Sequence, residues 1–143
     1  MIYTTPRLTK PIRFAGPLQA ELWVSADVVD ADWVVTLVDV WPNGFAQNLA
    51  TGILRSSARE SESTLSPLVP GNLYRLIVDI GHAAAKIEVN HLLRLEITGS
   101  HFPLYDRNTH TGKSPFGSEV QLANQTVFHD DSRPSSLLLP VIQ

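Results

Sequence analysis

The chain has 143 residues, which is the size of one ordinary domain and predicts a single domain spanning residues 1–143. Its hydrophobic fraction of 43% and charged fraction of 17% are typical of a globular protein. The formal net charge of −3 and the scattered Lys and Arg argue against a nucleic-acid partner, and the absence of Cys excludes disulfides and cysteine-ligated metal.

The N-terminal segment, residues 1–10, mixes Thr, Pro and Arg and has no apolar stretch of the kind found in signal peptides. The apolar runs of the chain are far shorter than the ~20 residues that a membrane-spanning helix requires. We therefore expect no membrane association. The localisation is otherwise undetermined, with the cytoplasm slightly favoured because no signal peptide is visible.

Hydrophobic periodicity predicts strands from the first third of the chain onward. Residues 18–27 alternate strictly between apolar and polar, which is typical of a half-buried strand, and Trp23 falls on the polar face. Residues 33–41 are apolar on both faces, which predicts a central strand covered on both sides, by the second sheet and a long loop or by another domain. The turn at 42–44, Pro-Asn-Gly, favours a hairpin in which residues 45–55 return antiparallel.

Later segments continue the all-β pattern. Alternation recurs at 73–80, 92–98 and 119–128, and a short apolar run at 136–142, interrupted by Pro140, predicts an edge strand. Three longer connections are expected: 56–70, 81–90 and 103–118. The second of these has room for only one or two helical turns. About seven or eight antiparallel strands with long crossings predict a Greek-key or jelly-roll β-sandwich.

Catalytic motifs are missing from the sequence. The Gly-x-Ser-x-Gly elbow of α/β serine hydrolases is absent. Ser100 and His101 are neighbours at a strand end, so their side chains point to opposite faces and do not share a proton. The five His residues show no pair at metal-ligand spacing, and no glycine-rich phosphate loop is present. We predict no catalytic residue, no metal ligand and no cofactor.

Two tryptophans leave a binding function open. An outward Trp stacks against sugars in many β-sandwich modules, and it packs under a loop or against a partner domain in others. Trp23 and Trp41 are the candidate sugar-stacking residues under the first interpretation. Because the Trp residues do not cluster in the sequence, we favour packing.

Several motifs, taken in order, resemble one protein family. They are ADWVVTLVDV with PNG (31–44), NLATGILR (48–55), PGNLY (70–74), LRLEI with SHFPLYDRN (93–108), QTVFHD (125–130) and SLLLPV (136–141). Together they resemble the C-terminal domain of X-Pro dipeptidyl-peptidases and cocaine-esterase-like hydrolases, the S15 peptidase family, over residues 4–142. One departure is Asn90-His91, where the family usually has Gly-His.

The resemblance implies an all-β fold, a mostly antiparallel jelly-roll (galactose-binding-like) β-sandwich, packed against an α/β-hydrolase domain that supplies a Ser-Asp-His triad. The chain itself would then be a non-catalytic accessory domain of a dipeptidyl-peptidase or esterase. It would stabilise that catalytic domain, in cis or as a separate chain, and border its substrate cleft or a homo-oligomer contact.

The resemblance also implies roles for particular side chains. Asp106 and Arg107 are expected to hold their loop by polar pairing. The candidate interdomain or loop-organising residues are Trp33, Trp41, Phe102, Tyr105, Asp106 and Arg107. Two alternatives stay open: a free-standing carbohydrate-binding module and, less favoured, an autonomous hydrolase.

Overall fold

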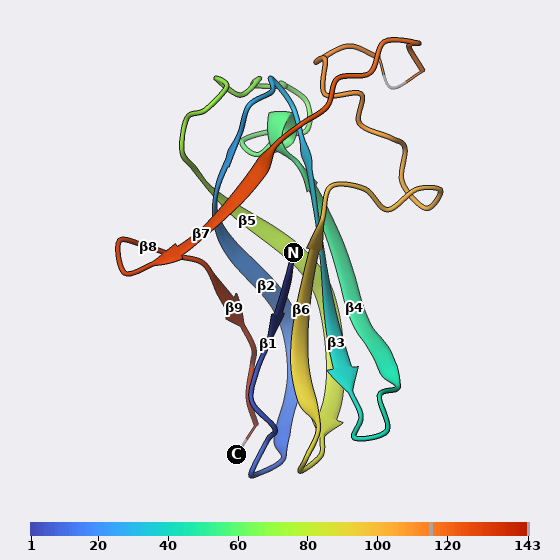
Figure 1. Cartoon of the computed structure of the whole chain (residues 1–143), viewed down its shortest axis with the longest axis vertical. Coiled ribbons are helices and arrows are strands. Elements are labelled where there is room, and N and C mark those ends of the chain that lie inside the picture. The colour runs from blue at the N-terminus through green and yellow to red at the C-terminus, as the bar shows by residue number, and fades with distance from the viewer. Residues whose placement is uncertain (115, 143) are drawn as a thin grey trace.

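The computed structural model describes residues 1–114 and 116–142 and consists of two antiparallel β-sheets packed face to face (Figure 1). The first sheet has the strand order β1-β6-β3-β4, formed by β1 (Ile2–Thr4), β6 (Leu92–Thr98), β3 (Asp32–Val40) and β4 (Ala46–Arg55). The second has the order β5-β2-β7-β8, formed by β5 (Tyr74–Ile87), β2 (Ile12–Ala26), β7 (Gln125–Asp130) and β8 (Arg133–Pro134). The short β9 (Ser136–Leu138) also pairs with β2, and a 3-10 helix, η1 (Ser56–Ala58), follows β4. The prediction of an all-β sandwich is confirmed.

The central strand β3 is buried on both faces, as its sequence predicts. Trp33, Val35 and Leu37 point into the core between the sheets. On the outer face, Val38 lies opposite Arg94 of β6, and Arg94 forms an ion pair with Glu96 at 3.5 Å. All nine residues of β3 are buried within this chain alone, so its covering comes from the chain itself and not from another domain.

The prediction of a connection at residues 81–90 is wrong. Strand β5 continues through this segment to Ile87 and pairs with the first half of β2, so that Ala85 faces Phe14 and Ala83 faces Gly16. The alanines of this segment are paired with β2, and the local sequence alone does not show that partner strand.

The C-terminal strands are shorter than predicted. Strand β7 begins at Gln125, because residues 119–124 belong to a long loop tied elsewhere in the fold. The predicted edge run at 136–142 is reduced to β9 and a single bridge between Phe14 and Val141. In the part of the chain that the structure describes, no helix is long and apolar enough to cross a membrane.

The sandwich is closed along one edge and open along the other. At the closed edge, Gly52 of β4 approaches the backbone of β5 so closely that an added Cβ would lie 2.7 Å from the Ile80 Cα and even closer to the Asp79 carbonyl oxygen. At the opposite edge, β1 and β6 face β7 and β9 across a cleft. The two sheets therefore form a wedge.

Candidate functional site

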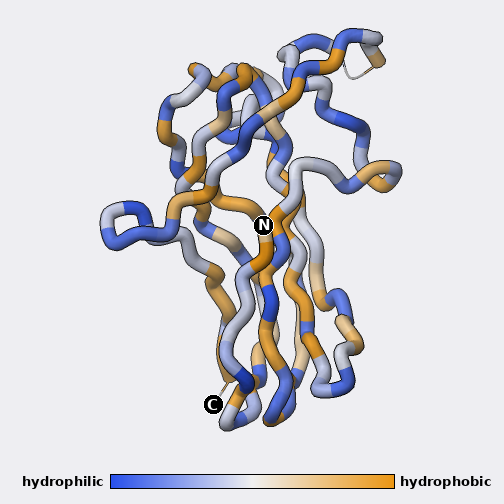
Figure 2. The backbone as a smooth tube through the Cα atoms, viewed as in Figure 1, coloured by the Kyte–Doolittle hydropathy of each residue, from blue (hydrophilic) through white to orange (hydrophobic). Residues whose placement is uncertain are grey.

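Two long loops lie at one end of the sandwich, at the top of Figure 1. The first, residues 59–73, connects η1 to β5, and the second, residues 99–124, connects β6 to β7. Figure 2 shows apolar stretches in both loops, away from the strands. Their exposed large apolar side chains are Leu65, Val69, Leu73, Phe102, Leu104, Phe116, Val120 and Leu122.

A buried polar network anchors the second loop to the sheet. Arg55, at the end of β4, donates from Nε and Nη2 to the two carboxylate oxygens of Asp32 at 2.8 and 2.9 Å. Asn108, from the loop, donates from Nδ2 to Asp32 Oδ1 at 2.8 Å and to Asp30 Oδ2 at 3.2 Å. Asp30 in turn accepts a hydrogen bond from the Ser57 backbone N–H at 2.9 Å. Because Asp32 is only 1% exposed, its charge depends on these partners.

Arg55 also reaches the loop directly. Its Nη2 lies 3.2 Å from Asp106 Oδ1, so one guanidinium joins the β3–β4 hairpin to the loop. The hydrogen bonds and the negative charge of Asp32, and to a smaller extent of Asp106, raise the pKa of Arg55 although partial burial opposes this. The guanidinium therefore stays charged wherever the protein is folded.

A second tie holds the far end of the same loop. Asp27 accepts hydrogen bonds from the backbone N–H and the side-chain Nδ2 of Asn124, at 2.7 and 2.6 Å. Gln121 N–H donates to the Thr109 carbonyl at 3.0 Å, which closes the loop on itself. The loop is therefore tied to the sheets at Asp106 and Asn108 and again at Asn124, while its large apolar side chains are exposed.

The Asp27 tie predicts a pH dependence. Its hydrogen bonds with Asn124 hold the pKa of the Asp27 carboxyl below the usual 3.8. A lowered folded-state pKa means that the tie contributes fully above pH 3.8 and is lost as the pH falls through the lowered value. In a ¹³C NMR titration of the carboxyl group, we expect a midpoint below 3.8 that returns to the ordinary range in Asn124→Ala. A wild-type midpoint at 3.8 would contradict the tie.

Trp33 does not lie where an interdomain residue must lie. Its side chain is 0% exposed in this chain, so no other domain contacts it. Its Nε1 donates to Ser56 Oγ at 2.8 Å, at the start of η1. The interdomain half of its prediction is therefore wrong, and the loop-organising half stays a prediction.

The predicted residues of the second loop differ in their surroundings. Phe102 is 71% exposed, and the Tyr105 ring lies 6.2 Å from the His101 ring. The expected polar pairing applies to Asp106, whose partner is Arg55. Arg107 is exposed and forms no ion pair with the described residues.

Trp41 and Trp23 lie neither near these loops nor near each other. Trp41 lies in the turn after β3, at the opposite end of the sandwich, 40% exposed between the rings of Phe45 and His91. His91 Nδ1 lies 2.8 Å from Asp39 Oδ1. Trp23 lies on the other sheet, opposite Arg75 and Phe128 in register. The two candidate sugar-stacking residues therefore form no common platform.

Sequence reasoning missed the anchoring set of Asp30, Asp32, Arg55 and Asn108. A signal existed for one pair: a two-residue turn at Asn43-Gly44 predicts Asp32 opposite Arg55, and the hairpin reaches this pairing through a register shift between Leu37 and Val38. The contribution of Asn108, 76 residues away from Asp32, has no counterpart in the local sequence. Among the described residues, no group of three or more His, Cys, Asp or Glu is placed to hold a metal ion.

Comparison with known proteins gives consistent matches. The family described as X-Pro dipeptidyl-peptidase C-terminal non-catalytic domain matches residues 1–138. Cocaine esterase from Rhodococcus sp. (strain MB1 Bresler) is 31% identical over 146 residues, covering 100% of this chain and 25% of that protein.

Two solved structures agree over the same extent. An α-amino acid ester hydrolase is 31% identical with a TM-score of 0.94, covering 99% of this chain and 25% of that chain. An aminopeptidase from a marine sediment archaeon, Thaumarchaeota archaeon, is 29% identical with a TM-score of 0.93, covering 100% of this chain and 26% of that chain. The chain thus spans about a quarter of the length of these relatives.

Proposed function

Since this chain belongs to the family of X-Pro dipeptidyl-peptidase C-terminal non-catalytic domains, we propose that it docks against an α/β-hydrolase catalytic domain and stabilises it. The docking surface is the end of the sandwich formed by loops 59–73 and 99–124. We place the catalytic domain in the same polypeptide, because the relatives are about four times longer than the matched region.

The observation that carries this proposal is the contrast within loop 99–124. Asp106 and Asn108 are tied to the sheet by the Arg55–Asp32 pair, whereas Leu104 and Leu122 are 69% and 93% exposed. A loop that is tied down and carries exposed apolar side chains is preorganised for burial, because less conformational freedom remains to be lost on docking. Each large apolar side chain that becomes buried contributes about 1.5–3 kcal/mol.

The reaction of the complete protein follows from the same relatives. Their names describe hydrolysis of esters and of N-terminal peptide bonds. We infer that the complete protein is an esterase or aminopeptidase of this kind and that its nucleophile lies outside residues 1–143. The docked loops would then border the substrate cleft. A contact between copies of the protein is an alternative use of the same surface.

A direct test combines gene sequence and activity. We expect the coding sequence upstream of Met1 to specify a Gly-x-Ser-x-Gly elbow, and we expect the 143-residue chain alone to hydrolyse neither p-nitrophenyl acetate nor Gly-Pro-p-nitroanilide. Turnover of either substrate by the chain alone would instead identify an autonomous hydrolase.

The docking surface is tested with matched leucines in the longer protein. Leu104→Ser with Leu122→Ser should lower the stability of the catalytic domain by about 3 kcal/mol, because two apolar contacts are lost. Leu138→Ser, on the exposed side of β9, is the control and should change stability by less than about 0.5 kcal/mol. In the isolated chain all three changes should be nearly neutral. Equal effects of the loop pair and the control would reject this surface.

The carbohydrate-binding alternative makes a separate prediction. It requires saturable binding of one sugar class, lost on replacing Trp23 or Trp41. Because these residues lie on different sheets, we expect a glycan panel to show no such binding.

A further inference from the structure

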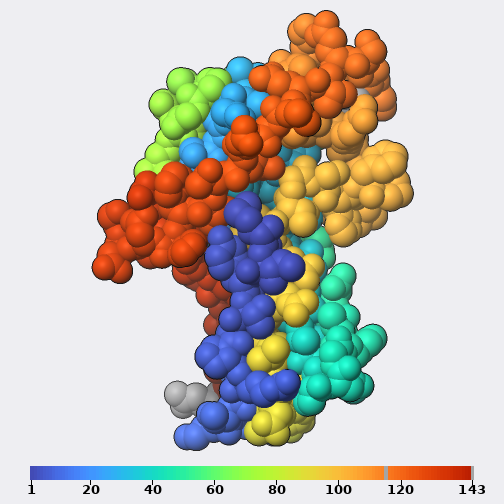
Figure 3. All heavy atoms as spheres, viewed as in Figure 1, coloured from blue at the N-terminus to red at the C-terminus, as the bar shows by residue number. Residues whose placement is uncertain are grey.

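The open edge of the sandwich holds a cleft that the proposed docking surface does not use. Its volume is about 300 Å³, and it lies between β1 and β6 of one sheet and β7 and β9 of the other. Figure 3 shows the N-terminal residues and the β7–β8 residues flanking this front face, below the two long loops.

The cleft exists because the sheets form a wedge. Gly52 brings β4 and β5 together at the closed edge, and the sheets diverge from there. Close packing normally fills such a gap with large side chains. Here the positions bordering the gap include Thr5, Ser135 and Ser136, which are too small to fill it.

The floor of the cleft is apolar. It is formed by Leu22, Leu93, Ile97 and Val127, which are only 1–8% exposed, and by the partly buried Leu95 and Leu137, which leave apolar surface uncovered. Apolar surface left uncovered in this way forgoes about 25 cal/mol per Å² of stabilisation, so a ligand that covers it gains the same contribution.

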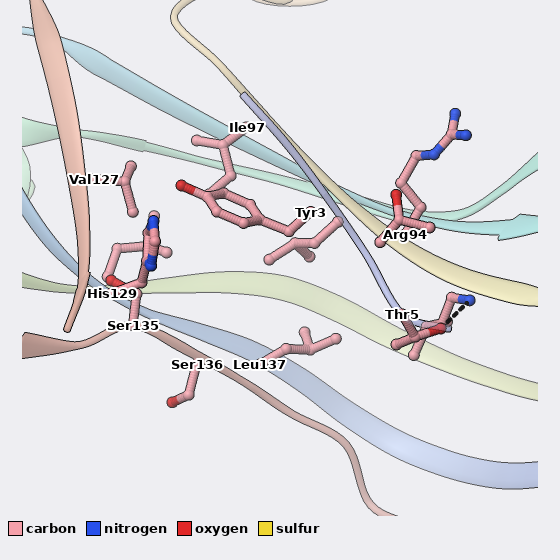
Figure 4. Close-up of a pocket in the computed structure, with 13 residues that line it drawn as sticks. Tyr3, Thr5, Arg94, Ile97, Val127, His129, Ser135, Ser136 and Leu137 are labelled. Atoms are coloured by element: carbon pink, nitrogen blue, oxygen red, sulfur yellow. Dashed lines mark hydrogen bonds between the residues drawn. The ribbon is translucent and has the colours of Figure 1, made fainter. Parts of the chain in front are cut away.

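The mouth carries two polar rings. Tyr3 extends across the cleft toward His129 and Val127 in Figure 4, and the rings of Tyr3 and His129 meet edge to face at 5.6 Å. The hydroxyl of Thr5 accepts a hydrogen bond from the Leu93 N–H. The hydroxyl of Ser135 donates to the Phe128 carbonyl and accepts from the Trp23 N–H. The Tyr3 hydroxyl and the His129 imidazole, together with the hydroxyls of Thr4 and Ser136, are thus the polar groups available to a ligand.

The charges around the mouth indicate a neutral ligand. Arg94 is among the lining residues, but in Figure 4 its side chain points away from the apolar floor, and it forms an ion pair with Glu96. Asp130 follows His129 and forms an ion pair with Arg133 at 2.6 Å, so its charge is balanced. No carboxylate is among the lining residues to attract a cation.

We propose that this cleft binds a small neutral molecule with an apolar body, such as a single six-membered ring, and one hydroxyl or carbonyl group. The ring covers the apolar floor, and the oxygen meets Tyr3 and His129. The volume is near the lower limit of ligand pockets, which span about 300–1,000 Å³, and therefore indicates a small ligand. This site is independent of the proposed function, because it lies away from both long loops.

The test is an NMR titration of the 143-residue chain with 4-methylphenol. We expect saturable ¹H–¹⁵N shifts confined to β1, β6, β7 and β9, with a Kd on the order of 1 mM. Benzoate, which has the same ring and a charge, should bind at least tenfold more weakly. D-glucose should cause no shifts at these strands.

Two variants make the result decisive. Leu137→Trp places a ring in the cleft and should abolish the shifts while leaving the rest of the spectrum native. Tyr3→Phe removes only the hydroxyl. It should weaken the binding of 4-methylphenol about tenfold and the binding of toluene less than twofold.

Shifts that survive Leu137→Trp, that fall on loop 99–124, or that appear equally with benzoate would overturn the proposal. So would binding of N-acetyl-leucinamide without binding of 4-methylphenol, since the occupant would then be a peptide side chain.

Discussion

Replacing Arg55 with Met should lower the free energy of unfolding by about 3–5 kcal/mol, because it removes one partner of a buried ion pair. Asp32 is 1% exposed and receives two charge-assisted hydrogen bonds from this guanidinium. Without Arg55, the Asp32 and Asp30 carboxylates share only the Asn108 amide and backbone N–H donors. Loop 99–124 also loses the contact between Arg55 and Asp106, so its amides should exchange faster with solvent.

Urea denaturation and hydrogen exchange measure these two effects. The control is Arg75→Met, which breaks the exposed ion pair with Glu21 on the outside of the second sheet. Exposed pairs contribute about 0–1 kcal/mol, so this variant should be close to wild type. The double variant Arg55→Met with Asp32→Asn should recover part of the loss, because one unpaired charge is removed. If Arg55→Met and Arg75→Met lowered the free energy of unfolding by the same small amount, the network would not anchor the loop.

Replacing Gly52 with Ala should destabilise the sandwich by about 3 kcal/mol or more, at or beyond the upper end of ordinary overpacking. The added Cβ meets the Asp79 carbonyl oxygen and the Ile80 Cα. Both belong to the backbone of β5, so no side chain can rotate to make room. The sheets must separate along the edge where they are closest, which weakens the core contacts of β4 and β5.

Thermal unfolding and a crystal structure of the variant test this expectation. Gly71→Ala is the control, because Gly71 has φ +80° and no atom within 4 Å of its Cβ position. That change adds backbone strain without a clash and should cost about 1–2 kcal/mol. A Gly52→Ala variant less than 1 kcal/mol below wild type would show that the sheets do not meet as closely as the structure places them.

Local sequence was sufficient for most strands and for the family. Strict alternation at residues 18–27 and 92–98 depends only on which side chains share a face. The segment 92–98 forms β6 with the predicted bounds, whereas 18–27 predicted only the later part of β2, which begins at Ile12 and ends at Ala26. The doubly apolar segment 33–41 likewise predicted the buried strand β3. The Asn43-Gly44 turn predicted the hairpin because Gly44 adopts φ +89°, which a residue with a side chain rarely does.

Features that depend on a distant partner were not predicted. The second half of β5 looks like a bland alanine segment until Phe14 and Ile12 of β2 pack beside it. Trp33 stands near the end of its strand in the sequence, yet the fold buries it completely against Ser56.

The sequence by itself therefore determined the sandwich, most of its strands, the family and the absence of a nucleophile elbow. Only the tertiary structure decided which charges anchor loop 99–124, where the sheets touch and where they part. The physical reason is range: strand formation follows from neighbours two residues apart, whereas Asp32 meets Asn108 across 76 residues and Tyr3 meets His129 only when the ends of the chain come together.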